Sequence, residues 1–173
     1  MIRDTRPGDA ADIQAIYEPY VTSTAISFEE HPPDASELER RIAAALVHLV
    51  AERDGAVVGF AYAAPFHPRP AYRWSVELSI YLAEDARGLG VGGELLTALI
   101  DRARDCGMVN ALALIALPND ASVTLFERHG FAQVGELADV GFKLGAWQPV
   151  GYWQLALREA TIPPPPFPPS AHG

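Results

Sequence analysis

The sequence predicts one α/β domain in which a central β-sheet is flanked by about four helices. Three observations carry this prediction. Several segments alternate apolar and polar residues, as strands with one buried face do, and other segments repeat apolar residues at helical spacing between capping residues. The chain has 173 residues, of which 49% are hydrophobic. That is enough for one well-buried core and too little for two.

The N-terminal part combines a short strand with two helices. Residues 2–6 predict the strand, and an amphipathic helix is expected from about Asp9, weakened near its end by Pro19. A second helix is expected after Asp34, because Asp34 and Glu37 hold the N-cap and N3 positions of a capping box.

The middle of the chain predicts a hairpin, a further strand and a long helix. The pair Asp54-Gly55 lies between two apolar runs and predicts a tight hairpin turn with positive φ. Residues 72–82 (YRWSVELSIYL) alternate in hydropathy and predict the fourth strand, with Glu77 on its polar face. After a glycine-rich loop, a helix is expected from about Gly92 to Cys106, ended by Gly107.

The last part of the chain predicts more strands around one helix. The apolar run 111–117 is typical of a strand covered on both faces, and a helix ending at His129 and Gly130 follows it. Further strands are expected near Phe131–Gly135, Val140–Lys143 and Val150–Leu157. We therefore place one domain at residues 1–160. Residues 161–173 are rich in proline, so we expect a tail outside the core.

Charge and composition disfavour several classes of function. The formal net charge of −9 at pH 7 argues against nucleic-acid partners, because binding to phosphates depends on many Lys and Arg. The five histidines are scattered, with no Cys beside them, so we expect no metal site. The single cysteine, Cys106, rules out an internal disulfide. The sequence shows neither a long apolar run nor a basic-then-apolar leader. We therefore expect no membrane contact and a cytoplasmic location.

The glycine-rich loop at residues 87–93 (RGLGVGG) matches a nucleotide-binding pattern. Gly88, Gly90 and Gly93 satisfy G-x-G-x-x-G, whose uncovered N–H groups bind phosphates at a helix N-terminus. A dinucleotide fold needs the first glycine at the end of its first strand and an acidic residue about twenty positions later. Here residues 83–87 separate the strand from Gly88, and residues 107–114 contain no Asp or Glu. An NAD-dependent oxidoreductase is therefore disfavoured.

The same loop resembles motif A, [RQ]-x-x-G-x-[GA], of the GNAT acetyltransferase superfamily through Arg87, Gly90 and Gly92. The segment LPNDASVTLFERHGF matches the family element in which a strand is followed by Asn and a helix that ends in Gly-Phe. With YRWSVELSIYL, GFKLGAWQPVGYWQ and TAISFEEHPP, the chain resembles the phosphinothricin N-acetyltransferase branch over most of residues 1–158. The resemblance implies a mixed, mostly antiparallel sheet of about seven strands, splayed between strands 4 and 5. It also implies acetyl-CoA as co-substrate and a homodimer.

The resemblance further implies which residues bind acetyl-CoA. They lie at the end of the fourth strand, in the glycine-rich loop and after the fifth strand: Ile80, Tyr81, Leu82, Arg87, Gly88, Leu89, Gly90, Val91, Gly92, Gly93, Asn119 and Ser122. The backbone N–H groups of the loop would hold the pyrophosphate, and Arg87 would add charge-assisted hydrogen bonds. Asn119 has a second interpretation as a plain helix N-cap.

Glu77 is the candidate general base. It is the only carboxylate between Trp74 and Leu82, so burial among strand residues should raise its pKa, and the resemblance implies the same role. A rim carboxylate in a salt bridge is the alternative. Phe126 stands where many relatives have Tyr or His to protonate the leaving thiolate. Solvent or another group must then supply the proton, or coenzyme A leaves as thiolate; His129 is a weak substitute.

The candidate acceptor-binding residues are Phe28, Glu29, Tyr72 and Arg73. Phe28 and Glu29 follow from the resemblance, and Arg73 could bind a substrate carboxylate bidentately or be a solvated rim residue. The sequence thus predicts acetyl transfer to the amino group of a small amino-acid-like acceptor, such as phosphinothricin or methionine sulfoximine. Two alternatives are acetylation of another amine, such as a protein N-terminus or a polyamine, and a non-catalytic acyl-CoA sensor.

Overall fold

A computed structural model describes residues 1–166, which form a seven-stranded sheet in the order β1-β2-β3-β4-β5-β7-β6. The strands are β1 (Ile2–Asp4), β2 (Val47–Arg53), β3 (Ala56–Pro65), β4 (Ser75–Leu82), β5 (Asn110–Ala116), β6 (Ala132–Lys143) and β7 (Ala146–Ala156). The α-helices of this part of the chain are α1 (Ala10–Ser23), α2 (Ala35–Ala44), α3 (Val91–Asp105) and α4 (Asp120–Arg128). None of these helices has the length and apolar character needed to cross a membrane.

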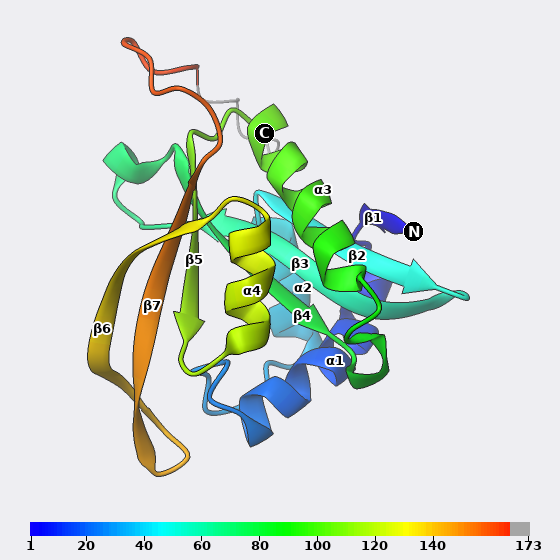
Figure 1. Cartoon of the computed structure of the whole chain (residues 1–173). Helices are drawn as coiled ribbons and strands as arrows, with labels where there is room; N and C mark the ends of the chain where they lie inside the picture. The colour runs from blue at the N-terminus through cyan, green and yellow to red at the C-terminus, as the bar shows by residue number, and fades with distance from the viewer. Residues whose placement is uncertain (167–173) are drawn as a thin grey trace.

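The helices form two layers, one on each face of the sheet. Helices α3 and α4 cover one face, and α1 and α2 cover the other (Figure 1). Leu95, Leu96 and Leu99 of α3 are fully buried in the larger core. A smaller core contains Ile13 of α1 and Phe60 of β3. The sheet therefore has two buried faces over most of its width.

The sheet splits between its fourth and fifth strands. β4 and β5 run parallel and pair only at Ser75/Asn110, Val76/Ala111 and Glu77/Leu112. Both strands continue beyond these pairs, β4 to Leu82 and β5 to Ala116, without pairing to each other. The other neighbouring strands are antiparallel. The expected mixed, mostly antiparallel sheet with a splay between strands 4 and 5 is confirmed.

The local signals for caps and turns also correspond to the structure. The carboxylate of Asp34 accepts a hydrogen bond from the Glu37 N–H at 2.8 Å and so caps α2. The side chain of Glu37 pairs with Arg41 instead of completing the capping box. Asp54 and Gly55 both have positive φ, as the tight turn between β2 and β3 requires.

The predicted start of the fourth strand is wrong, and Pro19 does not end the first helix. The fourth strand begins at Ser75 and not at residue 72, because Pro70 starts a 3-10 turn over Pro70–Tyr72. Helix α1 continues past Pro19 to Ser23, where the buried side chains of Tyr20 and Val21 hold its last turn against the sheet.

The predicted pair of strands at Phe131–Gly135 and Val140–Lys143 is one strand, β6. Its register against β7 shifts between Gln133 and Gly135 and again between Leu137 and Gly141. Such bulges absorb residues that look like a turn in the sequence, including Asp139 with its positive φ.

The proline-rich tail follows the last strand. In its described part, the Trp74 indole N–H donates to the Pro165 carbonyl at 2.9 Å, which brings the tail to the start of β4. The remainder of the predicted tail, residues 167–173, lies outside the described residues.

Candidate active site

The glycine-rich loop between β4 and α3 exposes backbone N–H groups. Gly88 and Gly90 have φ of +75° and +82°, a conformation that side chains other than glycine rarely adopt. Gly90 is the N-cap residue of α3 and makes no side-chain cap, so the first N–H groups of the helix remain open. Backbone N–H groups at a helix N-terminus bind phosphate, and the helix dipole adds to the attraction.

A groove of about 330 Å³ lies beside this loop, between the end of β4 and the start of α4. Nine of the residues predicted to contact acetyl-CoA line it: Ile80, Leu82, Arg87, Gly88, Gly90, Gly92, Gly93, Asn119 and Ser122. We call it the cofactor groove. Three predicted residues do not line it. Tyr81 packs among aromatic rings on the opposite face, Leu89 is 70% exposed, and Val91 is buried in the core.

Tyr20 of α1 also lines the cofactor groove. Its hydroxyl donates to the Leu82 carbonyl at 2.7 Å and accepts from the Leu82 N–H at 3.1 Å. Its ring lies 5.1 Å from the Arg87 guanidinium carbon. Tyr20 therefore fixes the end of β4 and orients the arginine of the loop. A tyrosine on the apolar face of a predicted helix carries no signal for this role.

The start of α4 forms the far wall of the groove. The Asn119 side chain accepts from the Ser122 N–H at 3.2 Å, which makes it the N-cap of α4 as well as a lining residue. Phe126 is buried edge-on against Phe131 and presents no proton donor to the groove. The His129 ring nitrogen Nδ1 lies 2.7 Å from the Leu125 carbonyl oxygen.

A second cavity, of about 540 Å³, lies on the opposite face of β4. We call it the acceptor cavity. Glu77, Ser79 and Tyr81 of β4 line it, and the side chains of β5, β7 and the loop after α1 complete its wall. Ile26 of that loop lines both the acceptor cavity and the cofactor groove. The two sites therefore meet beside the gap between β4 and β5.

Glu77 occupies the last position of the β4–β5 ladder, where the two strands separate. Burial raises the pKa of its carboxyl group, because the charged form loses hydration. Within residues 1–166 no ion pair involves Glu77, so the structure does not support the alternative that Glu77 is a rim carboxylate in a salt bridge. A half-buried carboxyl with a raised pKa at the edge of a cavity is suited to taking up a proton.

The loop after α1 carries Phe28 and Glu29, two of the predicted acceptor-binding residues, to the wall of the acceptor cavity. The Tyr17 hydroxyl lies 2.7 Å from the Ser27 hydroxyl and donates to Glu29 at 3.0 Å. Arg41 of α2 binds the same carboxylate at 2.5 and 3.2 Å. These contacts hold the loop in place on the α1–α2 side.

The hairpin of β6 and β7 holds the loop from its other side. The Lys143 ammonium donates to the Ser27 carbonyl, and burial lowers the pKa of Lys143. A side chain at Gly141 would collide with the Phe28 ring, so this glycine lets the ring lie on the β6 backbone. No pattern in the sequence connects this loop with Tyr17 or Arg41, which contact it from α1 and α2.

Tyr72 and Arg73 do not line the acceptor cavity. Arg73 lies at the start of β4, where its guanidinium donates to the Pro70 carbonyl at 2.8 Å and lies 5.2 Å from the Trp74 ring centre. Tyr72 packs against Phe66 and His67. In a single chain the structure therefore separates these two residues from Phe28, Glu29 and Glu77.

Comparisons with known proteins agree with this geometry. The acetyltransferase (GNAT) domain matches residues 2–148. The chain is 44% identical to the phosphinothricin N-acetyltransferase of Alcaligenes faecalis over 169 residues, covering 94% of this chain and 86% of that protein. It is 37% identical to an L-methionine sulfoximine/L-methionine sulfone acetyltransferase of Pseudomonas aeruginosa, covering 94% of this chain and 98% of the relative.

A solved structure has the same fold. The phosphinothricin acetyltransferase of Sinorhizobium meliloti, crystallised with acetyl-CoA, superimposes with a TM-score of 0.90 at 35% identity. The match covers 94% of this chain and 90% of that one. The family match, the two relatives and the split sheet lead to one conclusion: the chain belongs to the GNAT acetyltransferase family.

Proposed function

We propose that the protein transfers the acetyl group of acetyl-CoA to the amino group of a small amino-acid-like acceptor. One observation carries this proposal. The cofactor groove and the acceptor cavity lie on opposite faces of β4 and share Ile26 as a lining residue, and Glu77 lines the acceptor cavity where β4 and β5 separate. The bound acetyl-CoA of the Sinorhizobium meliloti structure and the acceptors named for the two relatives support the same reaction.

The loop residues suit the phosphates of acetyl-CoA. The open N–H groups after Gly90 and the Arg87 guanidinium supply donors for a pyrophosphate without requiring a metal. Among residues 1–166, no three His, Cys, Asp or Glu side chains are grouped so that they could hold a metal ion. The groove leads from the loop along Ile80 and Leu82 toward the strand gap.

Glu77 then acts on the acceptor amine. An ammonium cannot attack, so Glu77 takes its proton, directly or through one water molecule. The free amine forms a C–N bond to the thioester carbonyl carbon, and the nitrogen then releases its second proton to solvent. Collapse of the tetrahedral intermediate breaks the C–S bond and leaves the neutral amide. Phe126 cannot protonate the sulfur. Coenzyme A leaves as a thiolate, which is tolerable for a thiol with pKa of about 8.5, and solvent protonates it.

The charge of the acceptor cavity suits a cationic amine. Glu29 and Glu77 line the cavity, and none of its described lining residues is Lys or Arg. Arg41 binds the Glu29 carboxylate, so Glu77 is the lining carboxylate that pairs with no cation among residues 1–166 and can attract the ammonium group that it must deprotonate. Phosphinothricin and methionine sulfoximine, the acceptors named for the relatives, both carry such an amino group on an amino-acid backbone.

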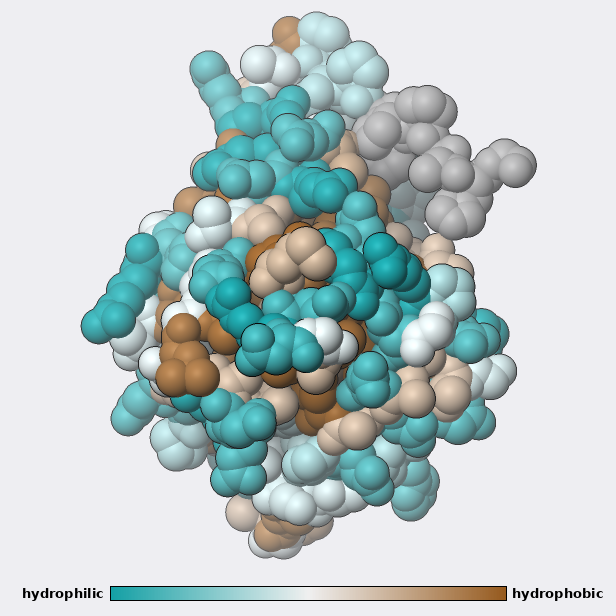
Figure 2. Space-filling view, turned by 90° about the vertical axis from the view of Figure 1, so that its right-hand side faces the viewer, coloured by the Kyte–Doolittle hydropathy of each residue, from teal (hydrophilic) through white to brown (hydrophobic). Residues whose placement is uncertain are grey.

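We also propose that the enzyme is a homodimer in the cytoplasm, where a lone thiol such as Cys106 stays reduced. The β6–β7 hairpin exposes six large apolar side chains: Val134, Leu137, Val140, Phe142, Leu144 and Trp147. An exposed apolar cluster of this size marks an interaction surface. The β1 side of the molecule differs, since it is mostly hydrophilic with small apolar patches near its middle (Figure 2).

The test is thiol release from acetyl-CoA, followed with a chromogenic disulfide. The acceptor panel holds phosphinothricin, methionine sulfoximine, methionine sulfone, common amino acids, polyamines and a peptide N-terminus. Turnover with the amino-acid-like acceptors is expected. Binding of acetyl-CoA by calorimetry with no turnover on any amine would contradict the proposal and favour a sensor.

A further inference from the structure

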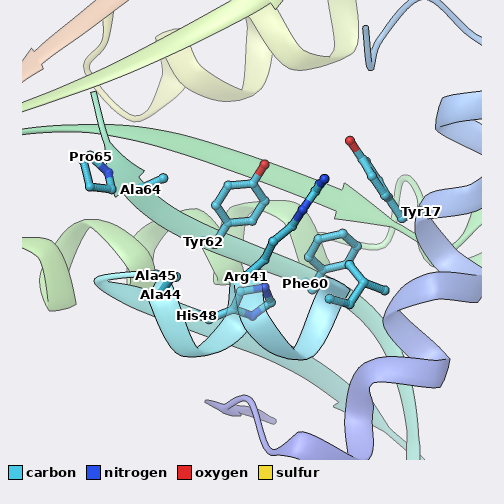
Figure 3. A pocket seen from close by; sticks show the side chains of 10 residues that line it. Tyr17, Arg41, Ala44, Ala45, His48, Phe60, Tyr62, Ala64 and Pro65 are labelled. Atoms are coloured by element: carbon cyan, nitrogen blue, oxygen red, sulfur yellow. The ribbon is translucent and has the colours of Figure 1, made fainter. Parts of the chain in front are cut away.

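A third cavity lies beneath α2, on the same face of the sheet as the acceptor cavity, and encloses about 260 Å³. We call it the α2 chamber (Figure 3). Its walls include Leu38, Ala44 and Ala45 from the α2 side and His48, Phe60 and Ala64 from β2 and β3. The reaction described above makes no use of it.

The α2 chamber adjoins the acceptor cavity. Tyr17 and Tyr62 line both spaces. Ala64 of β3 lies directly opposite Glu77 of β4 in the antiparallel ladder. Opposite residues in such a ladder project to the same face with their Cβ atoms about 5 Å apart. The chamber therefore begins beside the proposed base.

The inside of the chamber is apolar. The His48 ring lies nearly parallel to Phe60 and Tyr62, at centre distances of 5.8 and 5.6 Å. Nδ1 of His48 is bonded to the Thr5 hydroxyl at 2.7 Å, and burial lowers the His48 pKa to about 4, so the ring is neutral at pH 7. In residues 1–166, no buried side-chain polar atom lacks a hydrogen-bond partner. The aromatic faces of His48, Phe60 and Tyr62 thus offer an apolar group a surface on which to pack.

Arg41 stands at the edge of the chamber. Its guanidinium points to the same side as the Tyr17 and Tyr62 hydroxyls (Figure 3). It already binds the carboxylates of Glu29 and Glu37. Because two carboxylates match this cation, the chamber offers no free charge to an anionic ligand. An uncharged occupant is favoured.

We propose that the α2 chamber receives apolar acceptor side chains, so that aromatic and branched apolar amino acids are acceptors in addition to those named for the relatives. This inference rests on the proposed function. An apolar cavity of about 150 Å³ is known to hold benzene, so the chamber has room for such a side chain. The amino group stays beside Glu77 while the side chain extends past Ala64 beneath α2.

The experiment compares kcat/KM for phenylalanine and alanine as acceptors, in the wild type and in Ala44→Leu. The larger side chain fills the chamber, so the phenylalanine-to-alanine ratio is expected to fall by at least about tenfold. The matched control is Ala43→Leu, one position away on the same helix at an exposed site that does not line the chamber. Its ratio is expected to stay at the wild-type value. Ala64→Val provides a second filling variant if Ala44→Leu melts early.

The outcomes separate the two proposals. An unchanged ratio in both filling variants, with melting temperatures near that of the wild type, overturns the α2 chamber as an acceptor site. A wild type that acetylates methionine sulfoximine but not phenylalanine overturns it as well, and leaves the proposed function standing. Acetylation of no amine at all overturns the proposed function, and this inference with it.

Discussion

The cofactor groove and the acceptor cavity lie on opposite faces of β4, and they differ in how the chain builds them. The groove relies on backbone geometry within one short segment, Arg87–Gly93, where two glycines adopt positive φ. The acceptor cavity gathers side chains from α1, the following loop, and strands β3 to β7. A site made of consecutive backbone groups leaves a motif in the sequence, whereas a site made of distant side chains does not.

The largest expected effect comes from removing the base at the junction of the two sites. Glu77→Gln keeps the shape of the side chain but cannot take up a proton, so kcat/KM should fall by roughly 10²- to 10⁴-fold. In the wild type, kcat/KM should rise with pH through the raised pKa of Glu77, because the carboxylate is the active form. The measurement is the pH–rate profile from pH 5 to 9, together with acetyl-CoA affinity, which should not change. An unaltered profile in Glu77→Gln would falsify the assignment.

The second effect concerns the pH dependence of the free energy of unfolding. It depends on His48, which lies on the same face of the sheet as the acceptor cavity. Burial lowers the His48 pKa to about 4, below the value of about 6.5 expected in the unfolded chain. The unfolded state therefore binds more protons between these values, and stability is lost as the pH falls from 6.5 to 4. The loss should reach about 2 to 3 kcal/mol. Denaturant unfolding at several pH values measures it, with His48→Gln as the control in which this component of the pH dependence disappears. Parallel curves for the two proteins would contradict the prediction.

The third effect tests the backbone character of the cofactor groove. Gly90→Val places a β-branched residue at φ +82° and should weaken acetyl-CoA binding by about tenfold, because the loop must change conformation. Gly55→Val is the matched control, since Gly55 has φ +81° and equally open surroundings but lies in the β2–β3 turn. It should lose stability without losing affinity. Calorimetry with acetyl-CoA measures the affinity, and thermal melts measure the stability. Equal affinity in both variants would contradict the role of the loop backbone in binding acetyl-CoA.

The smallest effect comes from Tyr20→Phe, which removes the hydroxyl bound to both backbone groups of Leu82. Leaving these groups without their partner should cost about 1 kcal/mol of stability and raise the KM for acetyl-CoA a few-fold. Tyr17→Phe, whose hydroxyl serves the acceptor cavity, is the comparison. It should raise the KM of the acceptor and leave that of acetyl-CoA unchanged. A raised acceptor KM in Tyr20→Phe, or a raised acetyl-CoA KM in Tyr17→Phe, would contradict the assignment of the two tyrosines to different sites.

The predictions from sequence succeeded where the signal is local. The cap at Asp34 and the turn at Asp54-Gly55 depend on neighbouring residues, so both appear in the structure as expected. The start of β4 was wrong, because the 3-10 turn at Pro70 competes with the alternating pattern. The single strand β6 was missed since bulges against β7 accommodate residues that read as a turn.

The sequence by itself indicated the family and, through that resemblance, the split mixed sheet. It also indicated the glycine-rich loop and the placement of Glu77 on the polar face of β4, and these two features depend on residues close together in the chain. Only the tertiary structure decided which distant side chains meet at the acceptor cavity. It brought Arg41 to Glu29 and Lys143 to Ser27, and it placed Arg73 away from the cavity. These contacts depend on how α2 and the β6–β7 hairpin pack around the sheet, and no local pattern encodes such packing.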